Sequence, residues 1–261
     1  HVAVSLDSIS HETFKEYGIN YKQKWGYKNG KHGDFLPLSM YIKMRHILPE
    51  PILIYREGSE SWISPYIKIS DYAYLIGFYY GNGWFGENSI GISVKDRLVK
   101  DVVKEFSSLP NTKSSVRIKP TRGKSKEVII SNHLLFVILL NYLGHKKCDE
   151  KRLNSRIIIE WKNNTKKEVL RGLINSDGHI SKKNGRIYYT TTSPMLARTI
   201  NSLLRSIGVN GYIYARRVEK NYGGVVMGRK INGNKQSYSL HWSLYSQKGI
   251  CEKKKGFKNK V

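Results

Sequence analysis

Two stretches of nine residues decide how this chain folds: LIGFYYGNG at residues 75–83 and LRGLINSDG at residues 170–178. They align without a gap and begin roughly 95 residues apart, which indicates an internal duplication. Both carry a glycine at the third position, Gly77 and Gly172. A glycine in mid-helix costs about 1 kcal/mol relative to alanine, so its repetition predicts that another backbone comes close at that point. We therefore expect two motif helices that pack tightly against each other.

The elements around the two stretches follow in the same order. The first unit is expected to contain helices at 72–81, 96–106 (with Asp96 as N-cap) and 132–143, a hairpin over 84–94, and strands at 115–119 and 127–131. The second is expected to contain a helix at 166–176, a hairpin over 178–192, a helix from Ser193 to Gly208, and strands at 212–218 and 237–244. The fold class is therefore α+β, built from a duplicated α-β-β-α-β-β-α unit with pseudo-two-fold symmetry.

The chain divides into three expected regions. Residues 1–70 are irregular, with a short helix at 39–45 and a strand at 52–55, and form an N-terminal arm or small subdomain. Residues 71–150 form the first half of the duplicated body. Residues 151–261 form the second half and end in a basic C-terminal tail.

Composition narrows the class of partner. The 261 residues carry 45 Lys and Arg against 20 Asp and Glu, a formal net charge of +25. Such a surplus makes a polyanion the natural partner. Two cysteines exclude a disulfide framework or a cysteine-rich zinc finger, and no apolar run approaches the ~20 residues of a membrane span. We expect an intracellular protein that does not enter membranes.

The last polar residue of each stretch, Asn82 or Asp177, stands at a helix C-terminus just before a glycine. A carboxylate there faces the negative end of the helix dipole, and a divalent metal would relieve that penalty. The alternative for a single copy is a simple Asp-Gly turn, with Gly83 and Gly178 as ordinary left-handed helix-ending glycines. Two copies in register favour a metal site that serves phosphodiester chemistry.

The two nonapeptides resemble the LAGLIDADG motif of homing endonucleases, and the order of the flanking elements is similar to that fold over about residues 71–245. The resemblance implies a single-chain, monomeric saddle in which the motif helices pack at the centre and the sheets lie in the DNA major groove. It implies a site-specific endonuclease that hydrolyses both strands of double-stranded DNA at a long recognition site with Mg²⁺ or Mn²⁺. Genes of this family lie in introns or in inteins, and neither context is excluded.

The motif's functional positions carry over unevenly. Asp177 matches the acidic metal ligand, whereas Asn82 cannot supply an anion, and the resemblance places Gly81 and Ser176 beside them at the metal. Lys95 is expected as a basic active-site residue and Thr192 as its weaker counterpart. The resemblance therefore implies a nuclease disabled by Asn82, either as an inactive variant or by natural loss. His179 is expected to line a pocket or the core.

Nucleic-acid contacts are expected from strands, because alternate side chains of a two-stranded ribbon point into the groove. The expected contacts are Arg117, Lys119, Arg122, Lys124 and Lys126 in the first half, Arg186, Tyr188, Arg216, Lys230, Lys235 and Tyr238 in the second, and Lys22, Lys24 and Lys28 in the arm. The main alternative is a non-catalytic DNA- or RNA-binding protein, a maturase or a regulator, on a degenerate LAGLIDADG scaffold.

Overall fold

A computed structural model gives the structure of the chain. It describes residues 2–6, 10–18, 34–48, 50–56, 59–121, 125–144, 147–216, 223–226, 229–232 and 236–243. Within those ranges no helix is both long and apolar enough to cross a membrane.

The body is duplicated as expected. The first half contains α4 (Ala73–Asn82), β5 (Gly83–Phe85), β6 (Ser89–Lys95), α5 (Val99–Ser107), β8 (Ser115–Pro120), β9 (Ser125–Ser131) and α6 (His133–Leu143). The second half contains α8 (Asn163–Asp177), β10 (Gly178–Ile180), β11 (Arg186–Thr191), α9 (Pro194–Ser206), β12 (Gly211–Arg216) and β15 (Ser237–Ser243). Helix α7 (Ser155–Ile159) precedes α8, and β13 (Gly223–Val226) pairs with β14 (Arg229–Asn232) in a separate ribbon.

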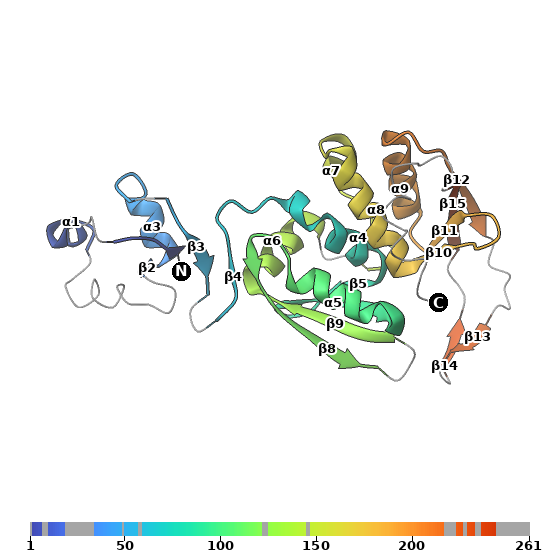
Figure 1. The fold of residues 1–261 in the computed structure, drawn as a ribbon, viewed down its shortest axis with the longest axis horizontal. Coiled ribbons are helices and arrows are strands. Elements are labelled where there is room, and N and C mark those ends of the chain that lie inside the picture. Colours follow the sequence, from blue (N-terminus) through green and yellow to red (C-terminus); the bar gives the residue numbers. More distant parts are fainter. Residues whose placement is uncertain are drawn as a thin grey trace.

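Each half holds a four-stranded antiparallel sheet of the same topology. The strand orders are β5-β6-β9-β8 and β10-β11-β15-β12, so each strand of one sheet has a counterpart in the other. Figure 1 shows α4 and α8 side by side between the two sheets. The predicted α+β fold, with its duplicated order of elements, is confirmed.

Local chemistry explains some of the helix starts and ends. The Ser193 hydroxyl accepts from the Leu196 amide at 3.0 Å and caps α9, and Gly144 ends α6 with a φ of 75°. Asp96 does not cap the helix that follows it, so that prediction was wrong. A 3₁₀ turn occupies residues 96–98 before α5 begins, and the Asp96 carboxylate lies 3.8 Å from the ammonium of Lys126.

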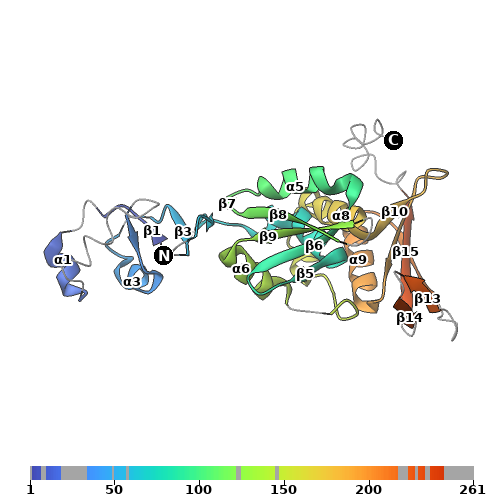
Figure 2. The same cartoon turned by 90° about the horizontal axis from the view of Figure 1, so that it is seen from below.

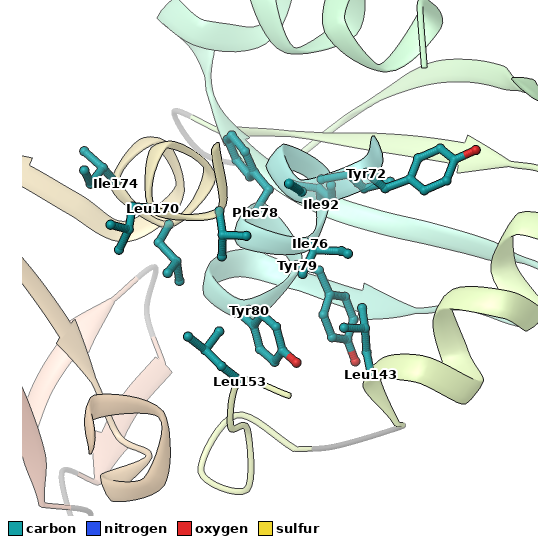
Figure 3. Close-up of a cluster of buried hydrophobic side chains, with 14 of the residues drawn as sticks. Tyr72, Ile76, Phe78, Tyr79, Tyr80, Ile92, Leu143, Leu153, Leu170 and Ile174 are labelled. Carbon is teal, nitrogen blue, oxygen red and sulfur yellow. The ribbon is translucent and has the colours of Figure 1, made fainter. Parts of the chain in front are cut away.

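The motif helices cross at their glycines. A Cβ added at Gly77 would lie 2.1 Å from the Val169 carbonyl oxygen, and one at Gly172 would lie 2.3 Å from the Tyr74 carbonyl oxygen. The two Cα atoms thus approach as closely as the sequence predicted, because no side chain separates the backbones. Around this crossing, side chains of α4 and α8 form the centre of one core that is shared by both halves (Figure 3).

Gly83 and Gly178 correct the expectation of a left-handed helix end. Both have negative φ, −96° and −75°, and extended backbone, so each motif helix passes directly into a strand. A Cβ at Gly83 would lie 2.4 Å from the Tyr79 Cα, and one at Gly178 would lie 2.5 Å from the Ile174 Cα. Glycine is required here by the lack of space and not by its conformational freedom.

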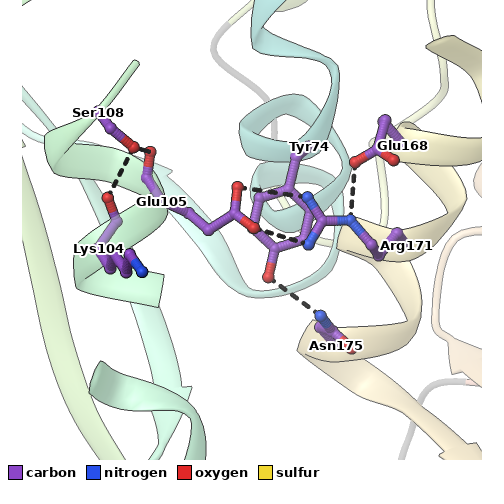
Figure 4. Close-up of polar contacts among 7 residues, drawn as sticks. All are labelled: Tyr74, Lys104, Glu105, Ser108, Glu168, Arg171 and Asn175. Carbon is purple, nitrogen blue, oxygen red and sulfur yellow. Dashed lines mark hydrogen bonds and ion pairs between the residues drawn. The ribbon is translucent and has the colours of Figure 1, made fainter. Parts of the chain in front are cut away.

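Arg171 joins the two halves on one side of the helix pair. Its guanidinium lies 3.8 Å from the centre of the Tyr74 ring and donates to Glu168 at 2.7 Å and to Glu105 at 3.0 Å (Figure 4). The Asn175 amide donates to the Tyr74 hydroxyl at 3.0 Å. Helices α4, α5 and α8 are therefore fixed to one another by polar contacts as well as by the core.

The N-terminal residues have a small core of their own, formed by side chains such as Leu6, Phe14 and Leu36. They contribute α1 (His11–Glu16), α3 (Leu38–Met44), β1 (Val2–Ala3), β2 (Phe35–Leu36), β3 (Leu53–Tyr55) and β4 (Trp62–Ile63). Their sheet continues through β4 to β7 (Thr112–Lys113) of the first half. Figure 1 and Figure 2 show these elements at one end of the molecule, outside the duplicated body.

Candidate metal site and nucleic-acid interface

The ends of the two motif helices bring Asn82 and Asp177 together. The side chain of Asn82 lies close enough to the Asp177 carboxylate to stabilise its charged form. The Asp177 side chain is exposed to solvent, although many protein atoms lie near its carboxylate. The partial loss of water around the carboxylate raises the pKa of Asp177 above its ordinary value, while the Asn82 side chain and the positive charges of Lys95 and Lys151 oppose the shift. The sequence-predicted pair thus shares one partly enclosed position.

Lys95 and Thr192 hold matching positions in the two sheets. Gly83 pairs with Ile92 across β5 and β6, and Gly178 pairs with Tyr189 across β10 and β11. Lys95 follows Ile92 by the same three residues that separate Thr192 from Tyr189, so the duplicated geometry relates them. Lys95 is exposed and near enough to Asp177 for electrostatic attraction, whereas Thr192 brings only a neutral hydroxyl.

Lys151 is a part of the site that the sequence analysis missed. Its side chain is buried, and its ammonium donates to the carbonyl oxygens of Tyr79 at 2.8 Å, Gly83 at 2.9 Å and Gly81 at 3.4 Å. The Ser193 hydroxyl donates to the Lys151 carbonyl oxygen at 2.6 Å and anchors the backbone. No local motif surrounds this lysine, so only the tertiary structure reveals that it caps the C-terminus of α4.

Gly81 and Ser176 face each other beneath the paired side chains. A Cβ added at Gly81 would lie 1.9 Å from the Ser176 hydroxyl oxygen, which donates to the Leu173 carbonyl oxygen at 2.8 Å. The Ser176 side chain is buried and already hydrogen-bonded. These two residues therefore fix the distance between the helix ends.

The donor set suits one hard cation better than two. In the described ranges no group of three or more His, Cys, Asp or Glu side chains is placed to hold a metal ion. What the helix ends do bring together is one carboxylate, of Asp177, and one amide, of Asn82. Oxygen donors of this kind fit Mg²⁺ or Mn²⁺, although a single anionic ligand gives a weak site.

The outer face of the first sheet carries cationic side chains. Along β8, Arg117 and Lys119 are exposed and share a face, and Lys119 lies 3.9 Å from the Glu127 carboxylate on β9. Lys126 precedes Glu127 on β9, so its side chain points to the opposite face of the sheet, where it forms an ion pair with Asp96. Strand alternation therefore places Arg117 and Lys119 on the outer face and Lys126 on the other.

The outer face of the second sheet carries a row of aromatic and histidine side chains. The strand register aligns His179, Tyr188, His241 and Tyr212 across β10, β11, β15 and β12. The His241 ring lies 4.6 Å from the rings of Tyr188 and Tyr214. His179 is exposed in this row, contrary to the expectation that it lines a pocket or the core. Burial and the positive charge of Arg186 lower the pKa of His241.

The remaining predicted contacts have different placements. Tyr238 packs against the core side of its sheet, and the backbones of Arg216 and Lys230 pair with Ser237 and Val225. Outside the described residues lie Lys22, Lys24, Lys28, Arg122, Lys124, Lys235 and the C-terminal tail.

A known family model matches the second half of the chain. Residues 164–241, from the start of α8 to β15, match the model described as the LAGLIDADG-like domain. Residues 164–241 are therefore a LAGLIDADG-like domain, which confirms the resemblance seen in the second motif.

Longer stretches of the chain are similar to one curated protein and to several solved structures. The chain is 26% identical over 200 residues to an uncharacterized protein of Methanocaldococcus jannaschii, covering 64% of this chain, and it spans about a fifth (21%) of that relative's length. A structure of mesophilic variants of the homing endonuclease I-DmoI is 17% identical in sequence, with a TM-score of 0.43. The similarity covers 70% of this chain and 93% of the I-DmoI chain. Full-length DUF199/WhiA from Thermatoga maritima is 14% identical, covers 74% and 61%, and has a TM-score of 0.42.

Proposed function

We propose that this chain binds double-stranded DNA across the outer faces of its two sheets and hydrolyses a phosphodiester bond at the ends of α4 and α8. The supporting observation is the pairing of Asn82 with Asp177 at the point where both motif helices pass into sheets. The net charge of +25 supports a polyanionic partner, and the confirmed LAGLIDADG-like domain supports this class of activity.

Asp177 and the amide oxygen of Asn82 are the groups that would hold a single Mg²⁺ or Mn²⁺. Such an ion would polarise a phosphate and lower the pKa of a bound water. Lys95, exposed and close to Asp177, is positioned to offset charge on the phosphate, and Thr192 can only orient water through its hydroxyl. Because the two halves differ in this way, we propose nicking of one strand as the activity and not cleavage of both.

Binding is proposed to use different chemistry in the two halves. Arg117 and Lys119 would neutralise phosphates, whereas Arg186 and the row containing Tyr188 and His241 present a mainly neutral, aromatic face. Residues 71–150 and 151–261 act as the two halves of this surface in the proposal. Residues 1–70 are proposed as an accessory arm, which is supported by the separate core of the N-terminal residues.

A second candidate is DNA or RNA binding without hydrolysis, as in a maturase or a regulator. The specific observation in its favour is that, among the residues that the structure describes, the helix ends bring together one carboxylate, with two lysines close to it. Both candidates predict a bound nucleic acid, so hydrolysis alone separates them.

The experiment begins with selection of bound duplexes from a randomised DNA library. A supercoiled plasmid carrying the selected site is then incubated with Mg²⁺ and either the unchanged chain or the Asp177→Asn variant. We expect the unchanged chain to nick the plasmid and the Asp177→Asn variant not to nick it. Both proteins should bind the selected DNA. No nicking by the unchanged chain would favour the non-catalytic candidate, and failure to select any duplex would refute DNA binding. Substituting Lys22, Lys24 and Lys28 by Gln should shorten the protected footprint if the arm contacts DNA.

A further inference from the structure

Lys151 breaks the pseudo-two-fold symmetry of the site. Its ammonium lies at the C-terminus of α4, with three carbonyl oxygens within 2.8 to 3.4 Å. At the C-terminus of α8, in the part of the chain that the structure describes, the Gly178 amide donates to the Ile174 carbonyl oxygen and no side-chain cation binds the last carbonyls. One half of the duplicated site therefore contains a built-in positive charge, and the other half does not.

The three carbonyl contacts favour the charged form of Lys151. A neutral amine has two N–H donors, whereas the three carbonyl partners use all three donors of an ammonium group. Burial lowers the pKa of Lys151, and the nearby Cys148 and Asp177 side chains, in their ionised forms, oppose that shift. A buried ammonium is stable only when its donors are satisfied and an opposite charge is near, and both conditions hold here.

We propose that Lys151 is the resident cation of the first half of the site and excludes a second divalent metal from it. This inference rests on the proposed function, since it concerns the number of metal ions that the same site accepts. The ammonium binds the Gly81 carbonyl oxygen, beside Asn82, and lies close enough to Asp177 to interact electrostatically. A divalent cation entering from the α4 side would meet both an occupied carbonyl and a fixed positive charge. One ion, held on the Asp177 side, is then the maximum.

The charge on Lys151 also determines what a carboxylate at position 82 could do. Restoring a carboxylate with Asn82→Asp would place the new negative charge near the end of α4, which Lys151 already caps. The carboxylate would be neutralised internally by the ammonium, so the substitution alone would not create a second metal site. Removal of the Lys151 charge must accompany it.

The test counts Mn²⁺ ions bound to the full chain by electron paramagnetic resonance, at protein concentrations above the dissociation constant. The unchanged chain and Asn82→Asp should each bind one ion, and Asn82→Asp with Lys151→Gln should bind two. Glutamine keeps N–H donors for the carbonyls but carries no charge. If that protein fails to fold, Lys151→Met replaces it in the same background. The matched control is Lys166→Gln with Asn82→Asp, because Lys166 is also buried but lies in the first turn of α8, at the opposite end of the helix from Asp177. This control should bind one ion.

Two ions bound to Asn82→Asp with Lys151 intact would overturn the inference, as would one ion in both variants that lack the lysine. A lysine that only caps α4 would lower the melting temperature when substituted and leave the ion count unchanged. If the unchanged chain binds no Mn²⁺, the metal site of the proposed function fails. The inference about Lys151 is then still decided by whether the two Asn82→Asp forms, with and without the lysine, differ by one ion.

Discussion

Substituting Gly172 by alanine tests the idea that the motif glycines exist for backbone contact. In an isolated helix this change is favourable by about 1 kcal/mol, because alanine is the better helix former. In the folded chain the added Cβ would lie 2.3 Å from the Tyr74 carbonyl oxygen, 2.7 Å from the Phe78 nitrogen and 2.9 Å from the Gly77 Cα. All three neighbours are backbone atoms of α4, so no side-chain rotation can make room.

The helices must therefore separate, by about 1 Å if the shortest contact is to approach a normal van der Waals distance. Separation loosens the core around Phe78, Leu170 and Leu173, which are all buried. Overpacking of this kind costs about 1–3 kcal/mol and more where the backbone cannot yield, which exceeds the helix-propensity gain. We expect a net loss of about 2 kcal/mol in the free energy of unfolding, or a melting temperature about 4–8 °C lower for a chain of this size.

Urea unfolding followed by far-ultraviolet circular dichroism measures the effect. The matched control is Ser202→Ala on α9, an exposed helical position where a smaller gain in propensity comes without any new close contact, and its stability should be unchanged or slightly higher. A Gly172→Ala protein as stable as the unchanged chain would show that the helices are not held in contact at this position. The close approach would then not be the reason for the glycine.

Four further outcomes are expected. Asn132→Ala should lower the free energy of unfolding by about 2–3 kcal/mol in urea titrations, because the buried amide caps α6 through Leu135 and donates to β4 and β7. Arg171→Lys should cost about 1 kcal/mol in the same assay, since a lysine cannot donate to two glutamates while lying over a tyrosine ring. Because the folded pKa of His241 is lowered, the chain should lose stability as pH falls through about 6.5 toward the folded pKa, and His241→Gln should remove that part of the loss from thermal melts. Arg117→Gln should make the slope of log K against log salt for DNA binding shallower by about 0.9, measured by fluorescence anisotropy, and an unchanged slope would place Arg117 outside the interface.

The sequence alone was sufficient to predict the duplicated helix, hairpin, helix and strand order and the meeting of the two motif ends. These features depend on the local periodicity of apolar residues and on glycines that lower helix stability and therefore need a packing reason. The periodicity and the glycines are both visible in the sequence. The pairing of Asn82 with Asp177 followed because a duplicated helix must bring equivalent ends together. The same reasoning failed for Gly83 and Gly178, where the conformation depends on the strand that begins at once and on packing against the preceding turn.

Only the tertiary structure decided which charges and aromatic rings face one another. Lys151 lies 72 residues from Tyr79 in sequence, and no periodicity links them. The row of Tyr188, His241 and Tyr212 exists because a particular register aligns three strands, and a shift of one residue would turn each side chain to the other face. Local sequence fixes which backbone conformations are favourable, but the position of a cation or a ring depends on contacts between distant segments, which form only when the whole core packs.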